Sequence, residues 1–108
     1  MSPTQLSLAA LRAAGYDPWV CEYWNHFSRK RVDMYGCWDI IAVRENEVLF
    51  VQTTTSGVAA RVRKIADSPH TPNIRKAGVR LEVHGWTKRK LKRGGKAERW
   101  VQRVVDVS

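Results

Sequence analysis

Two short apolar runs separated by three polar residues constrain the fold of this chain most. The first run covers residues 38–43 and the second covers residues 47–54, and only Arg44-Glu45-Asn46 lies between them. Both runs contain β-branched residues, which favour extended backbone. A connection of this length between two extended runs is typical of a tight turn, so the sequence predicts a β-hairpin.

The segments around this hairpin alternate between helical and extended patterns. Helices are expected between a capping Ser-Pro, Ser-Gly or Thr-Pro pair and a glycine or proline stop, at residues 2–15, 56–68 and 71–78. Further strands are expected at residues 19–23, 79–84 and 100–107, and residues 26–31 are expected to form a loop. A chain of 108 residues has room for one core. We therefore expect residues 1–108 to form a single α/β domain with a mixed central β-sheet flanked by helices.

The charge of the chain indicates a polyanionic partner. There are 19 Lys and Arg residues against 10 Asp and Glu, a formal charge of +9, and nucleic acid is the commonest partner of such a surface. Charge that merely maintains solubility is the alternative. No membrane partner is expected, because no segment is both long and apolar. The N-terminus has no basic start followed by an apolar run, so a cytoplasmic location is expected.

The cysteines and histidines do not form a recognisable metal pattern. Cys21 and Cys37 are not part of a CxxC pair, and the three histidines are scattered at positions 26, 70 and 84. Zinc sites need tighter ligand spacing than this. Two unpaired cysteines are typical of a reducing compartment.

An oxygen-rich site is predicted at one end of the hairpin. Asp39 stands at the mouth of the first strand, while Gln52 and Thr54 point to one side near the end of the second. If the strands pair, Asp39 and Gln52 meet where the strands splay. A carboxylate, an amide oxygen and a backbone carbonyl suit Mg²⁺, which can activate water. The alternatives are a turn role for Asp39 and simple surface polarity for Gln52.

The order of these features carries a resemblance. A helix precedes a hairpin with Gly-x-x-Asp (residues 36–39) on one strand and Gln-x-Thr (residues 52–54) on the next, and a helix and further strands follow. In this order residues 19–86 resemble the PD-(D/E)XK nuclease superfamily, in particular small phage and prophage nucleases related to Holliday junction resolvases and Vsr-type mismatch-repair enzymes. The segments that carry the resemblance are residues 22–25, 31–36, 38–40, 51–54, 60–65 and 82–86.

The resemblance implies a restriction-endonuclease-like fold and a set of metal ligands. Asp39 matches the metal-binding aspartate, Gln52 matches the second ligand, and Thr53 would offer its backbone carbonyl to Mg²⁺ or Mn²⁺. Glu22 is the candidate for the remaining carboxylate, with a surface charge at a strand edge as the alternative. Asp33 is a weaker candidate ligand, because its position favours a role in the turn that follows it.

The main departure from the family lies at Thr54, where the motif has a lysine that orients water and stabilises negative charge. Some members carry this lysine on the following helix. Lys64 is the candidate there, with Arg61 or Arg63 as substitutes, and a solvated helix face is the alternative.

Two basic clusters flank the predicted site. A cationic run occupies residues 88–96 and is expected to be a flexible loop that contacts phosphates, with a solvated hairpin tip as the alternative. Its basic members are Lys88, Arg89, Lys90, Lys92, Arg93 and Lys96. The second cluster is Arg29-Lys30-Arg31. Tyr35 and Trp86 either stack on unpaired bases or belong to the core.

The sequence therefore predicts a Mg²⁺- or Mn²⁺-dependent endodeoxyribonuclease that acts on branched or structured DNA, with a homodimer as the expected active form. A non-catalytic nucleic-acid-binding module that kept the fold is the main alternative, because the motif residues are changed at Gln52 and Thr54. A toxin-like ribonuclease is a third possibility that would not need the Asp39–Gln52 pair.

Overall fold

The predicted hairpin forms the centre of the sheet. In the computed structural model, which describes residues 1–108, β4 (Ile40–Arg44) pairs antiparallel with β5 (Glu47–Thr54). Ile40 lies opposite Val51, and Arg44 lies opposite Glu47 at the turn. Glu45 takes a positive φ of 51° in that turn, a left-handed backbone that tight two-residue hairpin turns require.

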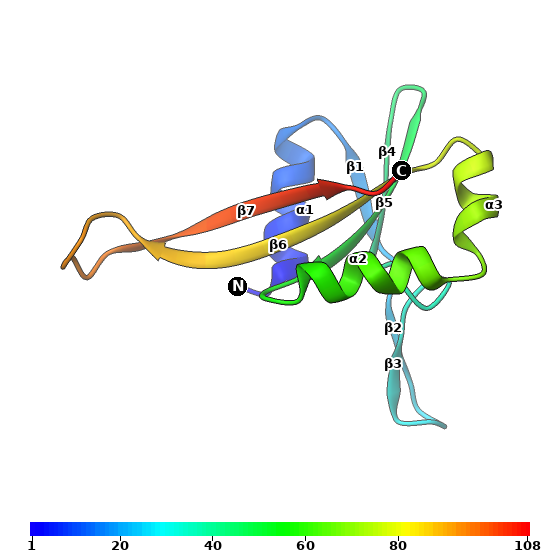
Figure 1. Cartoon of the computed structure of the whole chain (residues 1–108), viewed down its shortest axis with the longest axis horizontal. Helices are drawn as coiled ribbons and strands as arrows, with labels where there is room; N and C mark the ends of the chain where they lie inside the picture. Colours follow the sequence, from blue (N-terminus) through cyan, green and yellow to red (C-terminus); the bar gives the residue numbers. More distant parts are fainter.

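The five-stranded sheet has the order β1-β4-β5-β6-β7 and is mixed (Figure 1). β1 is Asp17–Val20, β6 is Arg80–Lys90 and β7 is Glu98–Asp106. The pair β5–β6 is parallel and every other neighbouring pair is antiparallel. A parallel pair needs a crossover, and α2 (Val58–Asp67) with α3 (Thr71–Lys76) provides it. The predicted mixed sheet with flanking helices is confirmed.

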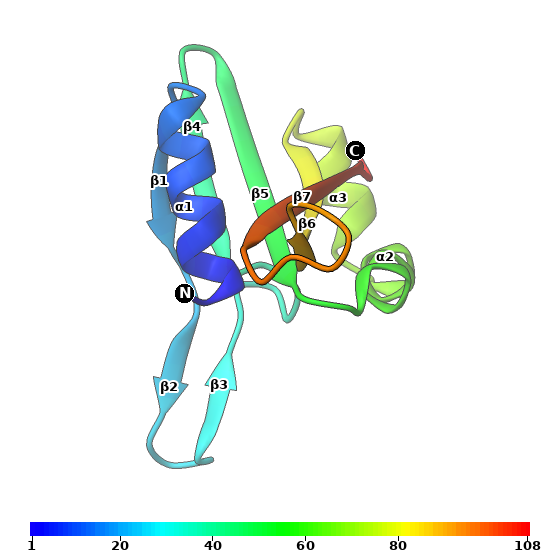
Figure 2. The ribbon, with the colours of Figure 1, turned by 90° about the vertical axis from the view of Figure 1, so that its left-hand side faces the viewer.

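Helices cover both faces of the sheet, as Figure 2 shows. The helix α1 (Pro3–Ala13) packs Leu11 against Leu49, Val51 and their neighbours in β4. The opposite face holds Phe50 and Leu81 against α2 and α3. Leu49 and Val51 thus face one layer and Phe50 the other, because side chains of a strand alternate between its faces. None of the three helices is long and apolar enough to cross a membrane.

The first turn of α1 is fixed by a reciprocal cap. The Ser2 hydroxyl accepts a 3.2 Å hydrogen bond from the Gln5 backbone N–H, and the Gln5 side-chain oxygen accepts one of 3.2 Å from the Ser2 backbone. Such a capping box satisfies N–H groups that the helix leaves free. The start of α1 lies beside the end of β5, where the Thr4 hydroxyl is 3.1 Å from that of Thr53.

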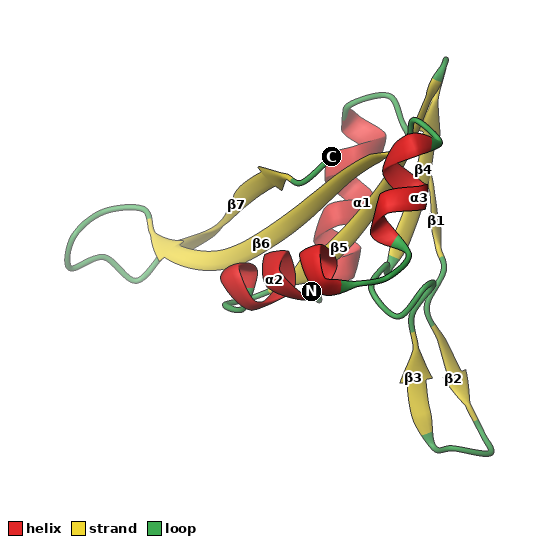
Figure 3. Ribbon diagram, turned by 45° about the vertical axis from the view of Figure 1, so that its right-hand side comes forward, coloured by secondary structure: helices red, strands yellow, loops and turns green.

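A second, separate hairpin includes the end of one predicted strand and the predicted loop that follows it. The strand expected at residues 19–23 ends at Val20, and after two intervening residues a two-stranded sheet of β2 (Tyr23–Asn25) and β3 (Lys30–Val32) begins. The expectation of a loop at residues 26–31 was wrong for Lys30 and Arg31, which pair with Asn25 and Trp24. Figure 3 shows this pair of strands projecting from the body of the protein. We call residues 23–32 the aromatic hairpin.

The cationic run is also more ordered than the sequence suggested. β6 continues to Lys90, well past the predicted end at residue 84, so the expected flexible loop was wrong for residues 88–90. These residues pair with the start of β7, where Lys88 lies opposite Trp100 and Lys90 opposite Glu98. The Lys88 ammonium stands 5.0 Å above the Trp100 ring, and such cation–π contacts stabilise the pairing. We call residues 88–100 the basic arm, which Figure 1 shows at the far end of β6 and β7.

Candidate metal centre

Asp39 lies one residue before β4, where β5 extends beyond its partner strand. Its backbone N–H donates to the Val51 carbonyl at 3.0 Å, so the ladder continues to this residue. The side chain is 4% exposed. Its Oδ2 accepts hydrogen bonds from the Thr53 backbone N–H at 2.8 Å, the Thr53 hydroxyl at 3.1 Å and the Gln52 amide nitrogen at 2.8 Å. Asp39 and Gln52 therefore meet at the splayed end of the hairpin, as the sequence indicated.

The amide of Gln52 presents its donor end to Asp39, and its oxygen has no partner. Oε1 of this side chain is buried and makes no hydrogen bond. Its burial costs free energy, because the oxygen loses its hydrogen bonds to water and gains none in return. Turning the amide over would place Oε1 against the Asp39 carboxylate, which is favourable only with a cation between the two oxygens. The Thr53 carbonyl lies 3.5 Å from the Gln52 amide nitrogen. Metal binding by Gln52 and Thr53 stays a prediction.

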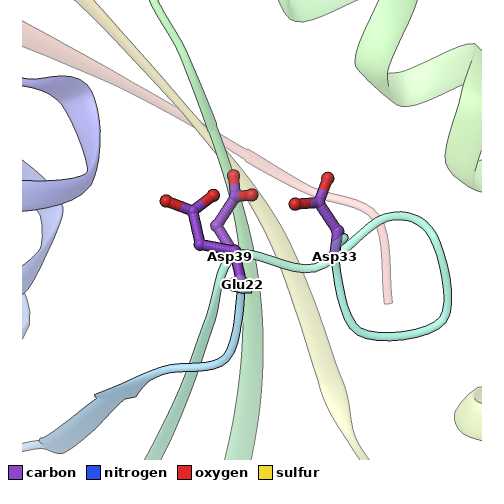
Figure 4. A group of neighbouring side chains, drawn as sticks. All are labelled: Glu22, Asp33 and Asp39. Atoms are coloured by element: carbon purple, nitrogen blue, oxygen red, sulfur yellow. The ribbon is translucent and has the colours of Figure 1, made fainter. Parts of the chain in front are cut away.

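Two further carboxylates join Asp39. One oxygen each from Glu22, Asp33 and Asp39 lies within 4.8 Å of the other two, and Figure 4 shows the three side chains gathered at the end of the sheet. Glu22 was a predicted member of the site, whereas Asp33 was the weaker candidate. The Asp33 carbonyl also accepts a 2.9 Å hydrogen bond from the Gly36 N–H, so the residue forms the predicted turn and lies in the cluster as well.

The cluster is electrostatically strained. Burial raises the pKa of the Asp39 carboxyl above its ordinary value, the Thr53 hydrogen bonds oppose the rise, and the neighbouring Glu22 adds to it. Burial and the charge of Asp39 raise the pKa of Asp33, although Lys64 and Arg61 counteract this. Carboxylates that crowd together disfavour one another's ionised form. A bound cation would relieve that repulsion.

A cavity of about 730 Å³ opens over these carboxylates. Its walls include the first turn of α1, the three clustered acids, Gln52 and Thr53. Two arginines complete the lining, Arg31 from β3 and Arg61 from α2. The Arg31 guanidinium donates to Glu22 at 3.2 Å. Acidic and basic groups therefore share one open, polar site.

The basic residues of α2 differ in their relation to the cavity. Arg61 is part of its lining, whereas Lys64 and Arg63 are exposed and are not. Lys64 is nevertheless close enough to Asp33 to lower its pKa. The Thr54 hydroxyl, at the position of the family's lysine, accepts a 3.1 Å hydrogen bond from the Gly57 N–H and holds the turn before α2.

The remaining predicted nucleic-acid ligands are exposed cations on the two projections. Those in the aromatic hairpin are Arg29, Lys30 and Arg31, and those in the basic arm are Lys88, Arg89, Lys90, Lys92, Arg93 and Lys96. Among the aromatic candidates, Tyr35 is 53% exposed and Trp86 is 7% exposed. The core alternative therefore holds for Trp86, whose ring nitrogen donates to the Ser7 hydroxyl at 2.8 Å.

A buried Ser7–His84–Glu82 chain was not anticipated. The Ser7 hydroxyl lies 2.9 Å from His84 Nδ1, and His84 Nε2 lies 3.0 Å from the Glu82 carboxylate. The ionised Glu82 carboxylate can only accept, so Nε2 carries the imidazole proton, and Nδ1 of the neutral ring accepts from the Ser7 hydroxyl. Ser7 is 0% exposed, so no substrate reaches it. The chain is a structural link between α1 and β6.

Comparisons with known proteins identify no relative: no protein-family model, curated protein or solved structure matches this chain. Membership of the nuclease superfamily therefore stays a prediction.

Proposed function

We propose that this protein is a Mg²⁺- or Mn²⁺-dependent endonuclease that hydrolyses phosphodiester bonds in branched or structured DNA. The observation that carries the proposal is the buried carboxylate of Asp39 at a strand end, with carboxylate oxygens of Glu22 and Asp33 within 4.8 Å. The acids face a cavity that also contains Arg31 and Arg61.

The donor set fits a hard divalent cation. Mg²⁺ takes oxygen ligands at about 2.1 Å, so ligands on opposite sides of the ion lie about 4.2 Å apart. Adjacent ligands of the same octahedral shell lie about 3.0 Å apart, so the three oxygens, which lie within 4.8 Å of one another, would have to move closer together around a bound ion. Asp39, Asp33 and Glu22 would hold the ion, and the unpartnered Gln52 oxygen is a further donor after rotation of its amide. When bound, such an ion polarises a phosphate and lowers the pKa of a coordinated water.

The surrounding residues would position the substrate. Thr53 and the Gln52 amide hold the Asp39 carboxylate in place through their hydrogen bonds. Arg31 and Arg61 present guanidinium groups that suit phosphate oxygens, and Arg61 is placed to stabilise negative charge that develops there. The aromatic hairpin and the basic arm would contact the backbone on either side, which provides affinity without sequence readout.

A non-catalytic nucleic-acid-binding module is the second candidate. The hydrogen bonds of Asp39 favour this candidate, because they give the carboxylate a structural role. Its oxygen accepts from the Thr53 backbone N–H, which has no backbone partner in β4. The hydroxyl of Thr54 likewise serves the backbone and cannot replace a lysine. A toxin-like ribonuclease, the third reading, gives no reason for three clustered carboxylates.

Cleavage assays separate these functions. Purified protein is incubated with labelled linear, plasmid and four-way-junction DNA and with RNA, in Mg²⁺, Mn²⁺ or EDTA. The proposal expects DNA cleavage that requires the metal and is lost in Asp39→Asn, while the exposed control Asp67→Asn remains active. DNA binding without cleavage under every condition would support the binding module. RNA cleavage that tolerates EDTA would support the ribonuclease.

A further inference from the structure

The aromatic hairpin displays large rings to solvent. Phe27 at its tip is 101% exposed, Tyr23 is 59% exposed and Trp24 is 53% exposed. The two strands pair only with each other, and Figures 2 and 3 show them standing clear of the sheet and helices. Packing within the chain therefore does not explain the rings, and clustered exposed apolar side chains typically mark an interaction site.

The tip is held in a defined shape. The Asn25 side-chain oxygen accepts hydrogen bonds from the backbone N–H groups of Phe27 at 3.0 Å and Ser28 at 3.2 Å. Arg29 takes a positive φ of 54° and turns the chain back into β3. Phe27 is thus presented on an ordered turn, which reduces the entropy lost when the ring binds a partner.

The charge of the hairpin identifies the partner. Its ten residues contain the three cations Arg29, Lys30 and Arg31 and no carboxylate. Trp24 and Arg31 are cross-strand partners, so a ring and a guanidinium share one face. Rings stack on base faces while cations contact phosphates, a combination typical of single-stranded nucleic acid. Two copies of this chain meeting here would instead bring six cations together.

We propose that the aromatic hairpin binds unpaired bases of DNA by stacking on Phe27 and Trp24, with Arg29 and Lys30 on the adjacent phosphates. A paired duplex hides its base faces, so the rings select unpaired or branched segments. The inference rests on the proposed function in taking DNA as the ligand and in expecting a cut nearby.

The position of the hairpin links this contact to the carboxylates. Glu22 directly precedes β2 and Asp33 directly follows β3, so two of the three clustered acids bracket the hairpin. Phe27 lies five positions after Glu22, and extended chain advances about 3.3 Å per residue, which gives a reach of roughly 17 Å. Stacked bases rise about 3.4 Å each along a strand. A strand that enters the cavity is therefore expected to be cut within about five nucleotides of the stacked base.

Equilibrium binding in EDTA tests the contact without cleavage. Fluorescence anisotropy is measured with a blunt duplex and with the same duplex containing a central unpaired bubble. Phe27→Ala and Trp24→Ala should each weaken bubble binding by about 5- to 140-fold, the loss expected for one stacked base. Affinity for the blunt duplex should stay within about twofold. Phe27→Leu, which keeps an apolar group without a ring, should resemble Phe27→Ala.

Val43→Ala is the control, since Val43 is an exposed apolar residue (44%) in β4 beside the turn that is remote from Asp39, and it should bind both DNAs like the unchanged protein. Equal losses on both DNAs, or none on the bubble, would overturn the inference. Loss of a dimer in Phe27→Ala with unchanged bubble affinity would assign the hairpin to self-association and also overturn it. Ring-dependent bubble binding without cleavage in any metal would leave the inference standing and refute only the nuclease. Metal-dependent cleavage together with bubble binding that does not depend on the rings would refute the inference and leave the nuclease proposal standing.

Discussion

At the scale of single residues, the Asp39 carboxylate has a structural task and a proposed chemical one. It accepts hydrogen bonds from Thr53 and Gln52 in a buried setting. Asp39→Ala leaves those donors unsatisfied, at a cost of about 1–3 kcal/mol. Asp39→Asn keeps an acceptor oxygen but loses the charge. We expect both variants to lose metal-dependent cleavage, while only the alanine variant melts several degrees lower. Near-normal cleavage by Asp39→Asn would refute the proposed site.

The clustered carboxylates also lead to a prediction about how the free energy of unfolding depends on pH. The folded protein holds the pKa of Asp33 above its ordinary value, so the folded state binds more protons than the unfolded state between the two pKa values. Stability should therefore fall as pH rises through that window, which begins near 3.8. Asp33→Asn should lose less stability over the same interval, and Mg²⁺ should stabilise the unchanged protein above it.

Thermal melts from pH 3 upward, with and without Mg²⁺, measure both effects. The difference between Asp33→Asn and the unchanged protein is the relevant quantity, because Glu47 and Asp106 have lowered pKa values and act in the opposite direction. If the stability of Asp33→Asn changes with pH in the same way as that of the unchanged protein, the pKa of Asp33 is not raised by the neighbouring carboxylates.

Asp39, Gln52, Thr53 and Glu22 of the candidate site could be predicted from sequence at this scale. Asp39 and Gln52 are cross-strand neighbours once the hairpin is recognised, because its short turn fixes the register. Asp33 could be named only as a weaker candidate, since its place beside Glu22 depends on the β2–β3 hairpin, which was not predicted. The donor end of Gln52 facing Asp39 also depends on atomic packing that no sequence pattern encodes.

At the scale of secondary-structure elements, α2 offers three basic residues that the fold distinguishes. Arg61 lines the cavity, the charge of Lys64 lowers the pKa of Asp33, and Arg63 is exposed outside the cavity. One electrostatic group at a reacting phosphate typically contributes ~10²–10⁴-fold to the rate. We expect Arg61→Ala and Lys64→Ala to slow cleavage at least about tenfold, with the larger loss for Arg61→Ala. Single-turnover kinetics should show little loss for Arg63→Ala and Thr54→Ala; the opposite ranking would remove α2 from the mechanism.

The basic arm makes a separate prediction about salt. Its cations are exposed, so neutralising Lys88, Arg89, Lys90, Lys92 and Arg93 should weaken binding equally across DNA sequences. Each lost phosphate contact should flatten the dependence of log K on log salt by ~0.9 on duplex DNA. Lys88 should contribute less than its neighbours, because it already lies over Trp100. Binding titrations between low and moderate salt measure the slope, and an unchanged slope would place the DNA elsewhere.

The two projections show where local sequence patterns stop being informative. The run at residues 88–90 has the composition of a loop, but pairing with β7 makes it a strand. In the aromatic hairpin, β2 and β3 have three residues each, which is too short for a period-two pattern to be recognised. Long-range pairing determines both elements, whereas the helices carry their start and stop signals locally.

At the scale of the whole molecule, the two projections leave the body in different directions (Figure 1), and the acids lie at the base of one of them. A straight duplex offers one backbone direction, whereas branched DNA offers several. This arrangement supports branched DNA as the proposed substrate, with unpaired bases at the aromatic hairpin and a duplex arm along the basic arm.

The last prediction is that the active form on branched DNA is a homodimer. The chain has one carboxylate cluster, and one such site cuts one strand, so paired cuts need two copies at a fixed separation, which two-fold symmetry provides most simply. Trp19 offers a contact surface, because it is 74% exposed on the edge strand β1. Light scattering should show the mass of two chains on a four-way junction, and Trp19→Glu should reduce it while retaining single nicks. Three results together would show that the monomer acts alone. They are a mass near 12.4 kDa without DNA, one chain per junction, and nicking of plain duplex as efficient as that of junctions.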